Sequence, residues 1–273
     1  MTRWPSPRRL LALGMTLVPV LTAVLGPALA GLPHAPPGGP YAPSGPHHLL
    51  GTDGLGRDVL TTTLQGGRSI LLLTLTATLL AYLLGGLAGL AAATGANRLV
   101  EQLLLRPLDV VVAIPALLLV SVAAVWLRGE ASAMALVIAF AYAPRIARIV
   151  HAAALDAAGR GAVEAMRQQR ESWACIHLGY IGRAALRPVV ADLDTRIVGV
   201  LYLVASANFL GLGFGPGSPD WAVTIARNES GLLLQPWSVL APATMIALLV
   251  VGVNLLGDDV LHRPRTARVG APR

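Results

Sequence analysis

The sequence predicts an all-α membrane protein with about six transmembrane helices, and three observations support this prediction. Hydrophobic residues make up 55% of the 273 residues and charged residues only 13%, whereas soluble domains carry about 25% charged residues. The apolar residues gather in stretches near the length of about 20 residues that a helix needs to cross a bilayer. The arginines fall unevenly on the segments between these stretches. The stretches cover residues 10–31, 69–94, 108–127, 131–150, 189–209 and 238–257.

The first stretch allows two interpretations. Arg3, Arg8 and Arg9 precede it, and Ala28-Leu29-Ala30 near its end resembles a signal-peptidase site. Internal glycines and prolines also weaken it as a helix. The stretch therefore predicts either a retained membrane helix or a cleaved signal peptide.

The remaining stretches are expected to be helices, because lipid offers no partners to unpaired backbone groups. Residues 69–94 contain no charge and form the clearest span. Gly85 and Gly89 within it either let another helix approach closely or are merely tolerated in lipid. Residues 108–127 and 131–150 follow as two further spans. The fifth stretch carries Asp192, Asp194 and Arg196 at its start, and the sixth, at 238–257, contains no charge.

The distribution of arginine predicts the orientation. With the N-terminus inside, the inner segments contain 16 arginines and the outer segments contain 4, with Arg196 near a membrane boundary. Cytoplasmic loops carry the excess of positive charge, so both termini are expected in the cytoplasm. The chain then divides into a first helix with an external Gly/Pro-rich segment (1–65), a core of five helices with a cytoplasmic loop at 151–188 (66–260), and a cytoplasmic tail (261–273).

Composition argues against several classes of function. All 21 basic residues are arginine and aromatic residues make up only 5%. Basic surfaces interleaved with aromatics are therefore lacking, and we expect no nucleic-acid partner. The sequence contains no GxxxxGK[ST] phosphate-binding loop, so we expect no ATP-hydrolysing site in this chain. The single cysteine, Cys175, is expected to be a small buried apolar residue. We predict no catalytic residue, no metal site and no cofactor.

A short polar segment stands out in the first outer loop. Three glycines, two aspartates, one threonine and one arginine lie within eight residues. Glycine permits positive φ, and aspartate and threonine cap tight turns. The segment predicts a compact turn closed by an Asp–Arg pair, followed by residues 60–68 along the membrane surface; an ordinary loop is the alternative. The residues of this motif are Gly51, Thr52, Asp53, Gly56, Arg57 and Asp58.

These residues carry a resemblance to a known family. With the following Gly67-Arg68-Ser69, the motif resembles the dipeptide/oligopeptide/nickel family of ABC importer permeases, and more closely the second, C-type permease of each pair. Later segments of the chain resemble this family in the same order, and the resemblance covers about residues 47–264. It implies the type I ABC importer permease fold. The later matches are Arg106-Pro107-Leu108-Asp109 before Ile114-Pro115, Asn208-Phe209-Leu210-Gly211-Leu212-Gly213, Pro219-Asp220-Trp221, Pro242, and Asn254-Leu255-Leu256-Gly257-Asp258.

The resemblance implies a permease subunit of an ATP-driven importer in the bacterial inner (plasma) membrane. Such a subunit forms half of the pathway for peptides or a similar small solute, for example a metal chelate. The implied partners are a second permease, two ABC ATPase subunits that hydrolyse the ATP, an external solute-binding protein and the lipid bilayer.

The family transmits force through a cytoplasmic coupling helix between the fourth and fifth helices. Residues 160–173 are compatible with a short polar helix ending near Trp173, with Met166 and Trp173 as partner-binding anchors. A surface helix without a partner is the alternative. The positions that match the coupling loop are Val163, Glu164, Ala165, Met166, Arg167 and Arg170.

The coupling loop departs from the family pattern. Arg170 stands where the pattern has a glycine that permits a left-handed turn, and Tyr180-Ile181-Gly182-Arg183 replaces His-x-Leu-Pro. The outer signature departs as well, since Ala222 replaces a glycine after Trp221. Either the helix continues past Arg170 or the docking is altered. The departure motivates an alternative function, a transport-inactive scaffold or sensory subunit that keeps the permease fold.

A secondary transporter or channel is a third class. Such proteins place charges near the bilayer midplane. Here Asp109, Asp192, Asp194 and Arg196 are expected near helix ends, which argues against this class.

Overall fold

The computed structural model describes residues 7–30, 36–95, 98–127, 130–215 and 217–261, and the described residues form helices and turns without a strand ladder. The predicted tail at 261–273 lies almost entirely outside the described residues. The elements are α1 (Pro7–Leu29), α2 (Val59–Thr94), α3 (Arg98–Ala113), α4 (Ala116–Leu127), α5 (Ala131–Ala158), α6 (Gly161–Gln168), the π-helical segment η1 (Cys175–Ile181), α7 (Gly182–Phe209), α8 (Trp221–Asn228), the 3-10 turn η2 (Glu229–Gly231) and α9 (Trp237–Leu261).

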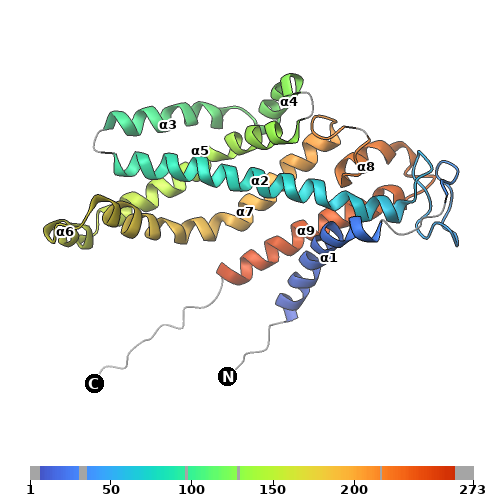
Figure 1. Cartoon of the computed structure of the whole chain (residues 1–273), viewed down its shortest axis with the longest axis horizontal. Coiled ribbons are helices and arrows are strands. Elements are labelled where there is room, and N and C mark those ends of the chain that lie inside the picture. Colours follow the sequence, from blue (N-terminus) through green and yellow to red (C-terminus); the bar gives the residue numbers. More distant parts are fainter. Residues whose placement is uncertain (1–6, 31–35, 96–97, 128–129, 216, 262–273) are drawn as a thin grey trace.

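The all-α membrane fold is confirmed, with a different distribution of spans. Among the described helices, α1, α2, α5 and α9 are long and apolar enough to cross a membrane, and the bent pair α3–α4 makes a fifth span if it crosses as one unit. Helix α7 has the length, at 28 residues. It is less apolar than these helices, because Asp192, Asp194 and Arg196 lie in its middle, but it packs beside α2 and α5 and runs from one end of the bundle to the other (Figure 1).

The predicted third span is not one straight helix. Helix α3 ends at Ala113, α4 begins at Ala116, and the two axes differ by 93°. Pro115 causes the break, because it has no N–H to donate and disfavours helical dihedrals at Ile114. Helix α3 begins at Arg98, ten residues before the predicted start.

Helices α2 and α7 also begin well before their predicted starts. Helix α2 starts at Val59, since the Asp58 side chain accepts a hydrogen bond from the Thr61 N–H and caps it. Residues 60–68 are therefore the first turns of α2 and not a separate surface segment. Helix α7 starts at Gly182, so Asp192, Asp194 and Arg196 lie in its middle and not near its end. Asp192 and Arg196 form an ion pair at 2.7 Å, and the Tyr82 hydroxyl donates to Asp192 at 3.2 Å.

Helices α2 and α5 form the centre of the bundle. A Cβ at Gly85 would lie 2.4 Å from the Ala143 carbonyl oxygen, and one at Gly89 would lie 2.3 Å from the Ala147 oxygen. The two backbones therefore touch, which is the close-approach interpretation of the glycine pair. Helix α1 packs on α9 in the same way, since a Cβ at Gly252 would meet Thr16.

The bundle has two distinct ends (Figure 1). One end carries α6 and the start of α7, and we call it the α6 end. The other carries residues 36–58 together with α8, and we call it the loop end. Helix α2, at 36 residues, is about 54 Å long, and it therefore extends beyond a hydrocarbon core of about 30 Å.

Candidate functional sites at the two ends of the bundle

The motif at the loop end folds around Asp53, whose side chain is fully buried. One carboxylate oxygen accepts the Leu55 and Arg57 N–H groups at 2.9 and 2.8 Å. The other lies 3.3 Å from a guanidinium nitrogen of Arg57 and 3.3 Å from one of Arg227. A buried carboxylate needs such partners, and the expected Asp–Arg turn is present with a second arginine from α8.

Two glycines of this motif are required by the backbone. Gly51 and Gly56 both have φ of +74°, a region that other L-residues rarely adopt. A Cβ at Gly56 would also lie 2.3 Å from the Gly38 carbonyl oxygen. Thr52 is buried, and its hydroxyl donates to the Gly39 carbonyl and accepts the Ala42 N–H.

The partner side of this turn was missing from the sequence-based prediction. The Asn228 side chain accepts the Gly54 N–H, and the Gln235 amide donates to the Ala42 and Leu50 carbonyls. Burial, and then the neighbouring Arg57, lower the pKa of Arg227, while Asp53 opposes this change. These contacts span more than 170 residues of sequence, so no local pattern could have paired them.

The glycine-rich signature ends α7 and starts α8. Gly211 has φ of +72°; its N–H bonds the Asn208 carbonyl, and the Leu212 N–H bonds the Ala207 carbonyl. This pair of bonds is the Schellman motif. Phe209 is the last residue of α7, Leu210 is its C-cap, and Gly213 packs against the Asn208 side chain.

Trp221 locks this signature onto α2. Its indole is fully buried and donates to the Thr63 carbonyl at 2.7 Å. The ring occupies the space left by two glycines, because a Cβ at Gly66 or Gly67 would lie within 2.6 Å of it. The buried Asp220 caps α8 by accepting the Ala222 and Val223 N–H groups, and it also accepts the Ser69 hydroxyl. Burial raises the pKa of Asp220 above its ordinary value, and these hydrogen bonds oppose the increase.

At the α6 end, helix α6 covers the matched coupling positions and is attached by one side. Val163 is its one buried residue and packs into a small second core with Ile176 and Ile181. Glu164, Ala165 and Arg167 are exposed. Half-buried Met166 packs against the same core, and the other side chains of this eight-residue helix face outward.

Arg170 has φ of +55°, so it adopts the left-handed conformation that the family pattern assigns to glycine. Its N–H bonds the Arg167 carbonyl, and the Glu171 N–H bonds the Met166 carbonyl. The Schellman motif of α7 is thus repeated at the end of α6. Of the two possibilities at Arg170, continuation of the helix is wrong, because α6 stops at Gln168.

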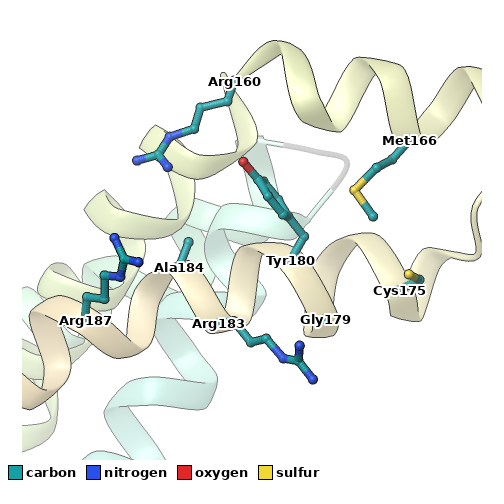
Figure 2. A pocket seen from close by; sticks show the side chains of 8 residues that line it. All are labelled: Arg160, Met166, Cys175, Gly179, Tyr180, Arg183, Ala184 and Arg187. Carbon is teal, nitrogen blue, oxygen red and sulfur yellow. The ribbon is translucent and has the colours of Figure 1, made fainter. Parts of the chain in front are cut away.

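The two residues expected to anchor a partner, Met166 and Trp173, differ in their exposure. Trp173 is 60% exposed and its ring lies 4.8 Å from that of His177. Met166 is half-buried and lines a groove of about 550 Å³ between α6 and the start of α7 (Figure 2). Cys175 also lines this groove and is exposed, so the expectation of a buried cysteine was wrong. The reason is that Ile176 takes the inward position of that turn.

Residues 85–265 match the family model of the binding-protein-dependent transport system inner membrane component. The chain belongs to this family. A Brucella abortus protein described as a peptide transport system permease is 33% identical over 265 residues, which cover 95% of this chain and 88% of that protein. The di/tripeptide transport system permease DppC of Pseudomonas aeruginosa is 31% identical over 213 residues, 78% of this chain and 70% of the relative. The family resemblance is therefore confirmed, and this permease is a multi-pass inner membrane component of an ABC transporter.

Proposed function

We propose that this permease is one half of the translocation pathway of an ATP-driven importer for peptides. The names of its relatives support the cargo. The observation that carries the proposal is the outward-facing α6, which is attached to the bundle through Val163 and closed by the left-handed turn at Arg170. A second permease, two ATPases and an external solute-binding protein would complete the complex.

The proposal gives each end of the bundle a side of the membrane. The α6 end would be cytoplasmic and bind an ATPase through Glu164, Arg167 and Trp173, which are exposed. The loop end would face the solute-binding protein. With α7 as the sixth crossing, both termini would then be cytoplasmic, as the arginine distribution predicts.

Co-purification tests the assembly. The full chain is expressed together with its second permease and a tagged ATPase, and the detergent extract is captured on the tag. We expect the chain to be retained, and Glu164→Ala combined with Arg167→Ala to reduce retention at least tenfold. Leu55→Ala, an exposed change at the loop end, is the matched control. If neither the unchanged chain nor the second permease is retained with the tagged ATPase, the proposal is contradicted.

The scaffold alternative rests on the arginine at position 170, where the family pattern has a glycine. Arg170 forms the same left-handed turn that a glycine would form, and this reduces the support for the alternative. ATP-dependent uptake separates the two functions: Arg170→Gly should leave uptake unchanged, and deletion of residues 163–170 should abolish it. Uptake that survives the deletion would favour the scaffold.

A further inference from the structure

The groove between α6 and the start of α7 has a charge pattern that ATPase docking does not require. Three arginines line it, Arg160, Arg183 and Arg187, and none of the described lining residues is acidic. Arg160 is bound to Asp156 at 2.6 Å through one terminal nitrogen, and guanidinium has further donors to offer. Neither Arg183 nor Arg187 forms an ion pair with a described residue.

The side chains divide the groove into two parts (Figure 2). Arg160 and Arg187 point toward the same end, and the Tyr180 hydroxyl lies toward Arg160. Met166 and Cys175 lie at the other end, and Arg183 leaves α7 on the opposite side. Two guanidinium groups and a hydroxyl therefore lie toward one end, and each group can donate hydrogen bonds.

We propose that this end of the groove binds the phosphate of an anionic phospholipid, with Arg160 and Arg187 as its ligands and Tyr180 as a third donor. Guanidinium matches the geometry of phosphate oxygens and binds them bidentately. Basic pockets beside membrane helices recognise such head groups.

Position favours a lipid over a free phosphate, which has the same binding chemistry. Val190 lies one turn beyond Arg187 on α7, and Leu155 directly precedes Asp156 on α5; both are exposed apolar side chains. An acyl chain could lie against them while the head group occupies the groove. The site would make the position of α6 sensitive to anionic lipid, because α6 forms one wall of the groove through Met166.

A direct binding measurement needs no ATPase, so its outcome is independent of the proposed import function. Isothermal titration calorimetry follows dioctanoyl phosphatidylglycerol added to the full-length chain in detergent. We expect saturable binding. Arg187→Gln should weaken it about fivefold and the Arg160→Gln, Arg187→Gln double variant about 25-fold, since one arginine near an anionic surface contributes about a factor of five.

Arg183→Gln is the matched control, because Arg183 lies one turn before Arg187 and points away; it should change the affinity by less than about twofold. Arg187→Lys, which keeps the charge and loses the fork, should lie between Arg187→Gln and the unchanged chain. Equal affinity for dioctanoyl phosphatidylcholine, or for sodium phosphate, would overturn the anionic-lipid assignment. So would an equal loss of affinity in Arg183→Gln, or binding that requires added ATPase.

Discussion

At the scale of single residues, two helices of this chain end in the same backbone motif with different side chains. Helix α7 uses Gly211 at φ of +72°, and α6 uses Arg170 at φ of +55°. A residue with a Cβ in this conformation costs about 1–2 kcal/mol relative to glycine. The two turns therefore allow the free energy of a glycine to be compared with that of an arginine at the same backbone position.

Arg170→Gly should stabilise the fold by about 1 kcal/mol, because glycine adopts the left-handed region without that penalty. Gly211→Ala is the matched change in the opposite direction and should destabilise by a similar amount, since a Cβ there meets no atom within 4 Å. Thermal unfolding of the detergent-solubilised chain measures both. A lower midpoint for Arg170→Gly would show that the arginine side chain contributes more than its backbone costs.

Asp220 gives a pH-dependent prediction. Burial raises its folded-state pKa above the ordinary 3.8, so the folded state holds the proton more tightly than the unfolded state does. The contribution of this group is most favourable below its unfolded pKa and is lost as pH rises through the folded value. Asp220→Asn keeps a capping side chain without the charge, so its stability relative to the unchanged chain should increase with pH above about 4.

The check is the difference in unfolding midpoint between Asp220→Asn and the unchanged chain across a pH series. Asp220→Ala is the control for the cap itself, because it lacks both the cap and the charge, and it should be about 1–2 kcal/mol less stable than Asp220→Asn at every pH. A difference between the asparagine variant and the unchanged chain that does not change with pH would contradict the pKa argument.

At the scale of elements, the α2–α5 contact is the most demanding part of the fold. Gly85 and Gly89 place the two backbones in contact, whereas a Cβ at the adjacent Gly86 would meet nothing within 4 Å. Gly85→Ala and Gly89→Ala should each destabilise by about 1–3 kcal/mol, because the helices must separate. Gly86→Ala should be neutral or stabilising. Midpoints of thermal unfolding in detergent would decide, and equal effects at all three positions would contradict the packing.

The sequence predicted where most helices lie more accurately than it predicted their first and last residues. Hydropathy identified α1, α2, α5 and α9, because each is a long apolar run. Hydropathy predicted one span for α3 and α4, because both are apolar and the proline at position 115, which breaks the helix, does not lower hydropathy enough to separate them. It started α7 too late because Arg183, Arg187, Asp192, Asp194 and Arg196 interrupt the apolar pattern although the helix continues.

The sites were predictable only where they are local. The Asp53–Arg57 turn could be inferred from residue types within eight positions. Its partners Arg227, Asn228 and Gln235 could not, because tertiary packing brings them there. Asp220 offered a missed signal, since an aspartate directly before a helix is a common N-cap.

At the scale of the whole molecule, the single cysteine tests the orientation of the permease. Cys175 lies at the α6 end and is exposed, so in intact cells or right-side-out vesicles it should resist a membrane-impermeant maleimide and react only after permeabilisation. A Cys175→Ser, Leu55→Cys variant moves the thiol to the loop end, where Leu55 is exposed, and should react from outside. The reverse pattern would contradict the topology.

We propose that α6 couples this permease to ATP hydrolysis, and ATP-dependent peptide uptake by proteoliposomes of the assembled complex measures this coupling. Glu164→Ala combined with Arg167→Ala changes two exposed side chains of α6 and leaves Val163 and the second core in place. We expect this variant to lose at least tenfold in uptake while its unfolding midpoint stays unchanged. Uptake at the level of the unchanged complex would contradict the coupling role of α6.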